Sequence, residues 1–260
     1  MKEKIYRCMI ELTNGRGSSI LLKKLTTSAF SKKFIRNYSK LYEINIEEVS
    51  KSMENFKSLH EFFTRSLKEG ARPVAQGETV FASPVDAKVE AFGDIRDGMT
   101  FFVKNKPYSL EDLLGSDERA DSYRNGKYIV FYLSPADYHR IHSPIDANVM
   151  RQYVLGQKSY PVNQFGLTYG KKPISHNYRM VSELAYTPER QTAFIKVGAM
   201  FVNSIQLTNT TNVWAKGEEV GYFTFGSTVV MLFEEDAIEF CGNVAAGRTI
   251  RMGEAFANML

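Results

Sequence analysis

Two histidines are the first residues whose type and spacing could do chemistry. His139 and His142 lie three residues apart in the segment Tyr138-His-Arg-Ile-His142, and the chain has only four histidines. Such imidazoles can act as general acid and base if a nucleophile and an orienting carboxylate come from elsewhere in the chain. They could also bind a metal, but the HExxH arrangement is absent and zinc would need a third ligand. The third interpretation is a purely structural role.

A candidate nucleophile lies in the segment Phe225-Gly-Ser-Thr228, directly before an apolar run. Gly226 has no side chain to shield its carbonyl and can adopt strained backbone angles, so the hydroxyl of Ser227 can reach that carbonyl. Attack of the serine on its own chain is therefore conceivable. The Gly-Xaa-Ser-Xaa-Gly elbow of the α/β-hydrolases is absent, because neither residue two positions from Ser227 is glycine. The simplest alternative is that Gly226-Ser227 forms an ordinary turn.

The elements that must position these residues change character near residue 75. Before it, apolar residues recur at spacings of three and four, which predicts helices. The two stripes are Ile5, Cys8, Met9 and Leu12, and Phe30, Phe34, Tyr38 and Leu41. The segment Ser58-Leu-His-Glu61 is a capping box that predicts one more helix, with stop signals at Gly70 and Pro73.

From Val80 onward, short β-rich runs predict strands. They cover residues 87–91, 128–133, 194–197 and 228–233, and a glycine turn at residues 216–218 leads into another. Residues 104–127 and 156–190 are predicted to be long loops with short elements. The sequence therefore predicts an α+β protein, with a helical region over residues 1–75 and a mainly β body over 76–260, built as a curved sheet or small barrel.

An internal repeat lies within the β body. Ser83-Pro-Val-Asp-Ala-Lys-Val89 and Ser143-Pro-Ile-Asp-Ala-Asn-Val149 are similar, and each is a turn that feeds a strand. Two related units predict a pseudo-symmetric core.

Composition excludes several classes of protein. The 260 residues are 43% hydrophobic, as in globular proteins, and no apolar run approaches the ~18 residues that a membrane-spanning helix needs. The N-terminal segment is interrupted by charge and lacks a cleavage site for a secretory signal, which favours a cytoplasmic protein. Cys8 and Cys241 are too few for a disulfide framework or a cysteine zinc site.

The net charge of +4 is distributed unevenly. Residues 1–40 contain ten Lys and Arg against Glu3 and Glu11, a net charge of +8, whereas the rest of the chain carries −4. A basic segment on a mildly acidic body predicts attraction to an anionic surface, either phospholipid or nucleic acid. Basic amphipathic helices suit an interfacial membrane anchor, and ordinary surface helices are the alternative.

Four segments, in order, resemble the phosphatidylserine decarboxylases, a family of self-processing pyruvoyl enzymes. They are Phe62-Phe-Thr-Arg65 with Arg72-Pro73, Ser83-Pro-Val-Asp86, Tyr138-His-Arg-Ile-His142 and Phe225-Gly-Ser-Thr228. Val197-Gly-Ala, Asn203-Ser-Ile205 and the segment 216–221 resemble intervening elements of the family. Each motif is modest alone, but the ordered set is specific. One departure is Ala87, where the family usually has glycine after the aspartate.

The resemblance implies a triad of Asp86, His142 and Ser227. Asp86 would orient His142, which would remove the Ser227 proton, and Ser227 would then attack the carbonyl of Gly226. β-Elimination and hydrolysis would leave a pyruvoyl group on residue 227, and would divide the protein into a β chain, 1–226, and an α chain, 227–260, that stay together. On sequence proximity alone, Asp146 is a rival orienting group, although it also suits a cap of its own turn.

The implied activity is decarboxylation of phosphatidylserine to phosphatidylethanolamine. The pyruvoyl group would bind the substrate amine as a Schiff base and accept electrons as pyridoxal phosphate does elsewhere, with neither pyridoxal phosphate nor a metal required. By resemblance, His139 would return the proton to carbon. The implied partners are phosphatidylserine, an anionic membrane surface and a second copy in a homodimer, not nucleic acid, and the expected location is peripheral, on the cytoplasmic face of the cell membrane.

Two alternatives stay open. The same machinery could decarboxylate a soluble amino acid, or the chain could be a non-catalytic membrane or carrier-type β module. In the second case Lys88 would be the modified residue, but the flanking carrier pattern is not met. His60 and His176 have no partner signature and are expected to be structural or surface residues.

Overall fold

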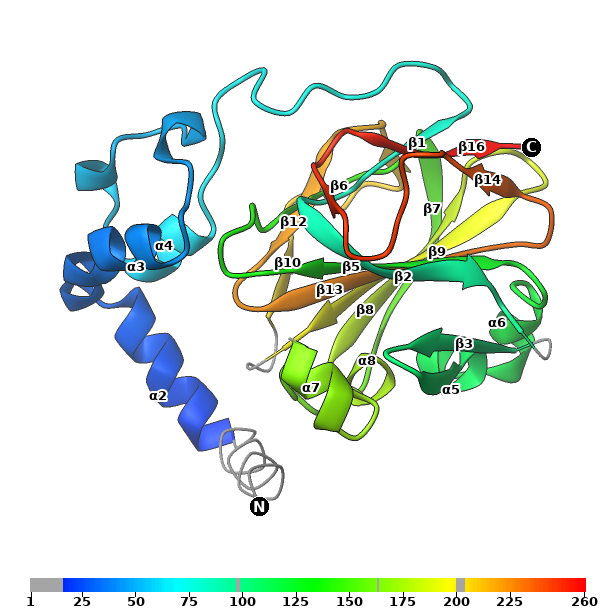
Figure 1. Cartoon of the computed structure of the whole chain (residues 1–260), viewed down its shortest axis with the longest axis horizontal. Coiled ribbons are helices and arrows are strands. Elements are labelled where there is room, and N and C mark those ends of the chain that lie inside the picture. The colour runs from blue at the N-terminus through cyan, green and yellow to red at the C-terminus, as the bar shows by residue number, and fades with distance from the viewer. Residues whose placement is uncertain (1–15, 97–98, 163, 200–203) are drawn as a thin grey trace.

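The computed structural model describes residues 16–96, 99–162, 164–199 and 204–260. The predicted stripe at Ile5 to Leu12 therefore lies outside the described residues. A group of helices lies beside a larger β body, and a long segment without regular structure connects the two (Figure 1). The helical group comprises α2 (Arg16–Thr27), η1 (Ala29–Phe34), α3 (Ile35–Leu41), η2 (Ile46–Glu48), η3 (Met53–Asn55) and α4 (Leu59–Phe63). None of the helices in these residues is long and apolar enough to cross a bilayer.

The capping box predicted at Ser58 is confirmed. Its Oγ accepts a 3.2 Å hydrogen bond from the amide of Glu61, which begins α4. The helix ends at Phe63, well before the stop signals predicted at Gly70 and Pro73. It ends there because residues 66–68 pair with residues 48–50 through backbone hydrogen bonds instead.

An eight-stranded antiparallel sheet forms the centre of the β body, in the order β11-β7-β8-β9-β13-β5-β2-β15. Two three-stranded sheets, β1-β16-β14 and β10-β12-β6, and the hairpin β3-β4 complete it. The strands are β1 (Val80–Ala82), β2 (Ala87–Asp94), β3 (Thr100–Val103), β4 (Lys106–Ser109), β5 (Lys127–Leu133), β6 (Arg140–His142), β7 (Ala147–Leu155), β8 (Arg179–Ala185), β9 (Gln191–Gly198), β10 (Ile205–Leu207), β11 (Val213–Trp214), β12 (Glu219–Phe223), β13 (Ser227–Phe233), β14 (Ile238–Phe240), β15 (Thr249–Ile250) and β16 (Ala255–Met259).

The prediction of a barrel is wrong. Within the described residues, β11 and β15 are the two ends of an open sheet and do not pair with each other. The small sheets pack against one face instead of closing the large one, and Figure 1 shows β1, β14 and β16 on the side of the large sheet that is opposite β3. The four predicted strands are confirmed as β2, β5, β9 and β13. The central strand β8 was missed, because it lies within the segment 156–190 that was predicted to be a long loop.

Alternation along β13 assigns its side chains to two cores. Val229 and Phe233 join the core between the large sheet and the small sheets, whereas Val230 joins the core beneath the short helices. Those helices are α5 (Leu110–Leu114), α6 (Asp117–Asp121), α7 (Gln164–Tyr169) and α8 (Pro173–His176). By the same alternation Ser227 faces the small sheets, one of which contains β6 with the histidine segment.

The predicted pseudo-symmetry is visible in the hydrogen bonds of the repeat. The hydroxyls of Ser83 and Ser143 each donate to a carbonyl two residues on, at 2.7 Å. The two turns also bond each other reciprocally. The amide of Ala82 donates to the carbonyl of Pro144, and the amide of His142 to that of Pro84, both at 2.9 Å. The repeat therefore fixes the start of β2 beside the end of β6.

Candidate active site

The peptide between Gly226 and Ser227 lies at the start of β13, where the side chain of Ser227 is fully buried. The carbonyl oxygen of Gly226 accepts a 2.9 Å hydrogen bond from the amide of Ala199. Among the described residues, the Oγ of Ser227 has no hydrogen-bond partner, which is costly for a buried hydroxyl. A Cβ built on Gly226 would meet only the Cβ of Ala199, at 3.9 Å. The carbonyl is therefore polarised, there is space beside the Cα of Gly226, and the Ser227 hydroxyl follows directly.

His139 is completely buried and has one free ring nitrogen. Its Nδ1 lies 2.9 Å from the carbonyl oxygen of Asp137 and must donate to it, which leaves Nε2 unprotonated. That Nε2 is buried and finds no hydrogen-bond partner in the part of the chain that the structure describes. Burial, together with the nearby Arg65 cation, lowers the pKa of His139 to about 3, although the bond to Asp137 opposes the shift. The imidazole is thus a neutral acceptor in the folded protein.

Aromatic stacking connects His139 to the residues around the Gly226-Ser227 peptide. The ring of Phe63 lies 4.0 Å from that of His139 and 5.3 Å from that of Phe225, measured between centroids. The carbonyl of His139 also accepts a hydrogen bond from the amide of Phe223, three residues before Gly226. His139 directly precedes β6, two residues before Ile141, which is in the core that Ser227 faces, so by alternation we expect His139 to face the same core.

His142 makes a different set of contacts. Its Nδ1 donates to the carbonyl of Gly217 at 2.9 Å, and its Nε2 accepts from the hydroxyl of Tyr138 at 3.1 Å. Burial lowers the pKa of His142 as well. Both of its ring nitrogens are therefore occupied in the precursor.

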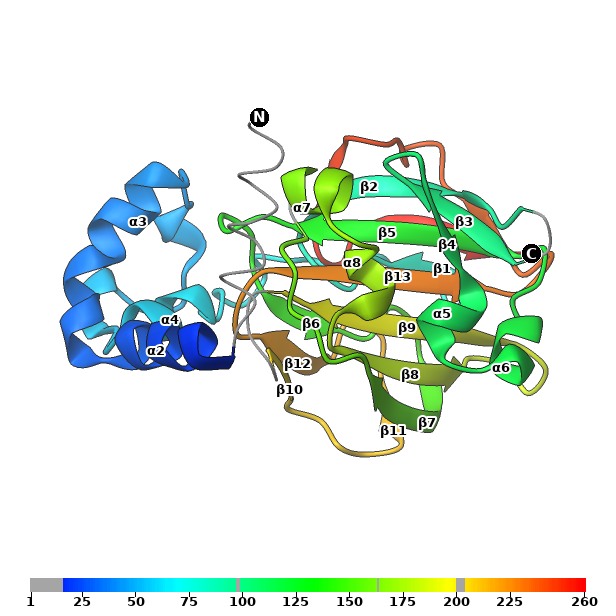
Figure 2. The ribbon, with the colours of Figure 1, turned by 90° about the horizontal axis from the view of Figure 1, so that it is seen from below.

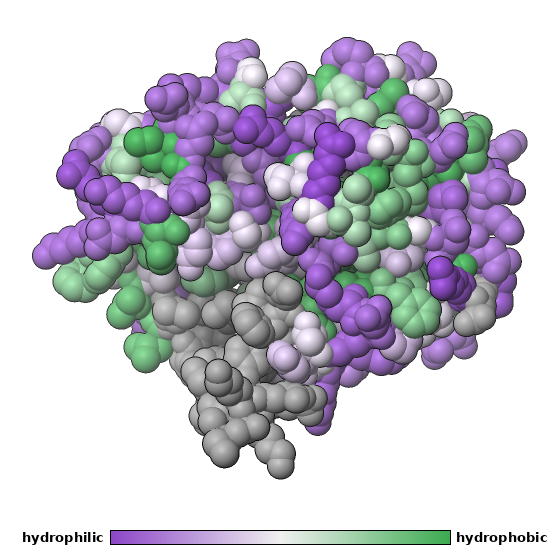
Figure 3. All heavy atoms as spheres, viewed as in Figure 1, coloured by the Kyte–Doolittle hydropathy of each residue, from purple (hydrophilic) through white to green (hydrophobic). Residues whose placement is uncertain are grey.

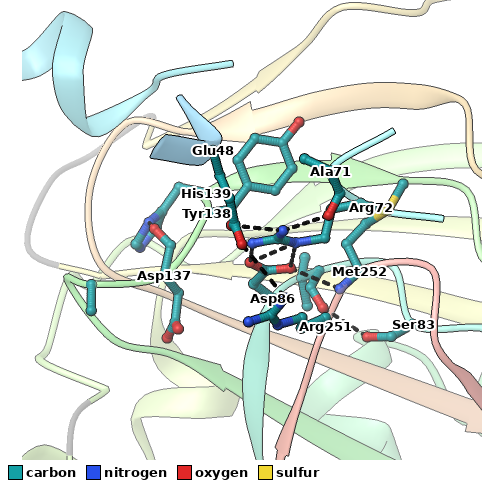
Figure 4. A network of polar contacts seen from close by, with 12 residues as sticks. Glu48, Ala71, Arg72, Ser83, Asp86, Asp137, Tyr138, His139, Arg251 and Met252 are labelled. Atoms are coloured by element: carbon teal, nitrogen blue, oxygen red, sulfur yellow. Dashed lines mark hydrogen bonds and ion pairs between the residues drawn. The ribbon is translucent and has the colours of Figure 1, made fainter. Parts of the chain in front are cut away.

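Asp86 does not bond to His142 in the described residues. Its carboxylate faces the guanidinium of Arg72 (Figure 4), with Nε 2.8 Å from Oδ1 and Nη2 2.6 Å from Oδ2. It also accepts the amide of Met252 at 2.8 Å. Glu48 binds the other side of Arg72 at 2.8 Å. Burial works against the charge of Arg72, but its hydrogen bonds to both carboxylates raise its pKa above the usual value.

The remaining residues singled out in the sequence lie outside this cluster, with one exception. Asp146 caps a turn, because its Oδ1 accepts the amide of Lys216 at 2.7 Å. Lys88 is exposed and lies within β2, paired with Tyr132 and Thr249, so it is not at a hairpin tip as a carrier lysine would be. His176 is exposed. The exception is His60, which lines a cavity beside Gly226.

This cavity, of about 270 Å³, lies between the helical group and the start of β13. Figures 1 and 2 both show the helices at that end of the large sheet. Its lining residues are Thr26, Tyr38, Tyr42, Leu59, His60, Phe63, Pro135, Phe225 and Gly226. A molecule that reaches Gly226 through this cavity therefore passes the helical group.

Several contacts of the site were not predicted from sequence. The amide of Ala199 is a backbone group, and its side chain gives no signal of its role. Phe63 and Arg72 lie within segments that were noted only for family resemblance, and their contacts with His139 and Asp86 depend on the fold. Tyr138 stands four residues before His142, and that spacing was the one available signal for their hydrogen bond.

Comparison with known proteins gives consistent matches over the whole chain. A sequence model of the family described as phosphatidylserine decarboxylase matches residues 59–258. Proteins of Bacillus thuringiensis (strain Al Hakam) and Bacillus cereus (strain 03BB102) are each 49% identical over 260 residues, which is 100% of this chain and 99% of theirs. Both are named phosphatidylserine decarboxylase proenzyme.

Proposed function

This chain belongs to the phosphatidylserine decarboxylase family, and we propose that it converts phosphatidylserine to phosphatidylethanolamine with a pyruvoyl group made from its own Ser227. The observation that carries the proposal is the arrangement of one peptide bond. A buried hydroxyl, for which the described residues supply no hydrogen-bond partner, follows a carbonyl that already accepts an amide hydrogen bond. Among the alternatives, the family match favours this function over a soluble amino acid substrate or a carrier module.

Self-cleavage begins with attack of the Ser227 Oγ on the carbonyl carbon of Gly226. The Ser227 proton passes to a base, the amide of Ala199 stabilises the developing oxyanion, and the Ser227 nitrogen leaves with a proton to give an ester. Loss of the Cα proton of residue 227 then expels the Gly226 carboxylate, and water releases ammonia to leave a ketone. The products are chains 1–226 and 227–260. A pyruvoyl group at residue 227 supplies the electron sink that decarboxylation needs.

The contacts favour His139 as the base of the first step, although the sequence predicted His142. The Nε2 of His139 is unprotonated and has no partner among residues 16–96, 99–162, 164–199 and 204–260, and the ring of Phe63 stacks between His139 and Phe225. Both ring nitrogens of His142 already make hydrogen bonds, Nδ1 to Gly217 and Nε2 to Tyr138. The same His139 nitrogen is suited to hold the proton that returns to carbon after decarboxylation. The orienting role predicted for Asp86 stays a prediction.

A membrane surface as the source of substrate is supported by the helical group, which exposes a set of large apolar side chains in addition to the core that it buries. Thr26, Ser31 and Ser39 are buried, whereas large apolar side chains are exposed. The exposed ones are Ile20, Leu21, Leu25, Phe30, Phe34 and Leu41, at 44 to 74% of full exposure. Figure 3 shows apolar and charged surface side by side over these helices. Residues 16–42 include seven Lys and Arg and no acidic residue, which suits an anionic interface.

The peripheral location on the cytoplasmic face and the homodimer are part of the proposal through family resemblance. Sedimentation of the purified protein tests the dimer. Fractionation of cells tests the location.

Denaturing mass spectrometry tests the processing step. Wild-type protein should give two fragments, 1–226 and 227–260, and the smaller one should be blocked to Edman degradation by its ketone. The Ser227→Ala variant should stay as one chain. The processed protein should convert phosphatidylserine in vesicles, and free serine serves as the competing substrate. A wild-type chain that stays whole after native expression contradicts the proposal, and preference for free serine contradicts the lipid substrate.

A further inference from the structure

The turn that precedes His139, residues 134–137, is closed by its own hydrogen bonds. The amide of Asp137 donates to the carbonyl of Ser134 at 3.0 Å, and the Oδ2 of Asp137 accepts the amide of Ser134 at 2.6 Å. The carbonyl of Asp137 is also the acceptor for the Nδ1 of His139, at 2.9 Å. Because this bond determines which ring nitrogen carries the proton, the position of the turn sets the state of His139.

Two side chains from outside the β body hold three successive carbonyls of this turn. The hydroxyl of Tyr38, in α3, donates to the carbonyl of Pro135 at 3.1 Å. The Nη2 of Arg65, two residues after α4, donates to the carbonyls of Ala136 and Asp137 at 2.7 and 3.0 Å. The carbonyl oxygen of Asp137 is thus shared between Arg65 and the imidazole.

The helical group also contacts the imidazole itself. The ring of Phe63, the last residue of α4, lies 4.0 Å from the ring of His139, measured between centroids. His139 is therefore held at its ring by α4 and through its turn by Tyr38 and Arg65. All of these contacts come from residues 38–65, although the histidine belongs to the β body.

Packing alone does not account for Arg65. It is 4% exposed, and within the described residues it forms no ion pair. Its Nε and Nη1 are buried and have no hydrogen-bond partner in the same residues. A buried cation with unused donors lowers the free energy of unfolding. Burial is the main cause of the low pKa of His139, and the charge of Arg65 lowers that pKa further. A role beside His139 thus accounts for a cation that stability does not favour.

We propose that Tyr38 and Arg65 are positioning residues for His139, and that they hold its ring through the turn 134–137. The proposal rests on the proposed function, which gives His139 its part in the reaction. The effect passes through the backbone of the turn, so it requires no contact between either side chain and the substrate. The helical group then serves the chemistry as well as the supply of lipid.

The test uses Tyr38→Phe and Arg65→Lys. The first removes one hydroxyl and keeps the ring, and the second keeps the charge but loses the planar fork that reaches two carbonyls. Tyr128→Phe is the matched control, because the hydroxyl of Tyr128 also donates to a carbonyl, that of Phe102, at 2.9 Å. Tyr128 pairs with β13 at the end of that strand away from Ser227.

The first measurement is the rate at which the Nδ1 proton of His139 exchanges with water, followed by nuclear magnetic resonance. It is made in the Ser227→Ala background, where the chain stays whole and no substrate is present. Tyr38→Phe and Arg65→Lys should raise the exchange rate about tenfold, as expected when a hydrogen bond that holds the turn is lost. Tyr128→Phe should leave it unchanged, even if it lowers the urea midpoint equally.

The second measurement is decarboxylation by processed protein of a short-chain phosphatidylserine dispersed as monomers, which takes membrane docking out of the rate. Tyr38→Phe and Arg65→Lys should lower kcat roughly ten- to hundredfold with little change in KM, because a catalytic group misplaced by ~1 Å costs as much. Tyr128→Phe should keep the wild-type kcat.

Two results would overturn the proposal. One is an exchange rate and a kcat in Tyr38→Phe and Arg65→Lys that match those of Tyr128→Phe. The other is a rise in KM alone, which would mean that the two side chains bind the substrate directly. If Arg65→Lys does not fold, Tyr38→Phe decides, since it loses a single hydroxyl. A wild-type chain that is never cut would instead refute the proposed function, and the exchange measurement on the uncut chain would still show whether the turn is held.

Discussion

The amide of Ala199 and the carbonyl oxygen of Gly226 form a 2.9 Å hydrogen bond between the end of β9 and the residue before β13. The donor is directed at the oxygen on which negative charge develops when Ser227 attacks. A donor fixed in advance by the sheet needs little rearrangement as the charge forms, which makes such groups effective. The same ladder, Gly198 opposite Ser227, sets the position of both.

Ala199→Pro removes this donor and should slow self-cleavage. Loss of one oxyanion donor costs roughly 10²- to 10³-fold in rate. The measurement is the time course of conversion to two chains, followed by denaturing gel after purification of the precursor. Ala199→Ser keeps the amide and is the control for the buried side chain. Cleavage of the proline variant at the wild-type rate, in a protein of native circular dichroism, would show that the amide does not take part.

Replacing His139 and His142 one at a time should affect self-cleavage differently. His139→Ala removes the free Nε2 and should abolish conversion to two chains. His142→Ala loses bonds to Gly217 and Tyr138, and should still cleave, at a lower rate because the turn at residue 217 loosens. Mass spectrometry of both proteins after equal incubation gives the answer. The reverse outcome, with His142→Ala uncut and His139→Ala cut, would support the roles predicted from sequence.

Binding to anionic vesicles should depend on the lysines of the helical group. Replacing Lys23, Lys24, Lys32 and Lys33 with Gln should weaken binding in proportion to the charge removed, at about 1 kcal/mol per residue near the surface, and flatten the salt dependence. Cosedimentation with phosphatidylserine vesicles at low and high salt measures this. Lys88, Lys158 and Lys171 are exposed lysines of the β body, and their replacement is the control. If both sets of replacements weaken vesicle binding equally, the helical group is not the docking surface.

The parts of the fold that the sequence predicted are those with a local signal. β13 and β5 are apolar runs, and the Ser58 capping box marks α4 without any knowledge of the fold. The length of α4 was not predictable, because it ends where residues 66–68 find partners in residues 48–50. The stop signals at Gly70 and Pro73 therefore have no effect, because tertiary contacts end α4 before the chain reaches them.

β8 was missed because its polar residues are buried against partners that are distant in sequence. Arg179 donates to the carbonyls of Leu113 and Asp112, and Ser182 accepts from Lys196. Glu183 accepts from the hydroxyl of Tyr153. A strand with such a composition looks like a loop until those partners are known. The candidate catalytic residues could be named from the sequence for the opposite reason, since their types and order resemble those of a known family although their contacts are not evident in the sequence.

The stability of the precursor should fall as the pH drops below about 6.5, the usual pKa of histidine. The folded state holds the pKa of His139 at about 3, so between these values the unfolded chain binds a proton that the folded chain does not. The contribution of His139 to the free energy of unfolding is therefore fully present above pH 6.5. It decreases toward pH 3, by at most about 1.4 kcal/mol per pH unit.

Urea unfolding of the Ser227→Ala precursor at several pH values measures that slope. His139→Asn keeps a donor toward Asp137 and should make the slope shallower, whereas the exposed His176→Asn should leave it unchanged. An unaltered slope in His139→Asn would mean that the acid sensitivity comes from other groups, such as His60 and His142, whose pKa values burial also lowers.

Lys196 is a buried amine for which the proposed chemistry has no use, and its replacement by Met should stabilise the protein. It is fully buried in β9, and its Nζ donates to Ser182 at 2.5 Å beside the rings of Phe194 and Trp214. Burial lowers its pKa to about 7, so between pH 10.5 and pH 7 the unfolded chain binds a proton that the folded chain does not. The resulting cost of folding grows as the pH falls from 10.5 to 7 and is constant below that.

Lys196→Met should remove this cost while filling most of the same volume. Replacement of a buried charged group by an apolar one of similar size stabilises by about 1–4 kcal/mol, and loss of the bond to Ser182 takes back about 1 kcal/mol. Urea unfolding in the Ser227→Ala background should show the gain at pH 7 and a smaller gain at pH 10, where the wild-type amine is neutral in the folded state. Because Lys196 and Ser227 face the same side of the sheet, self-cleavage of the otherwise wild-type variant is the second readout. A destabilised variant would show that the buried amine stabilises the fold, whereas a variant that folds and does not cleave would show that the amine serves the chemistry.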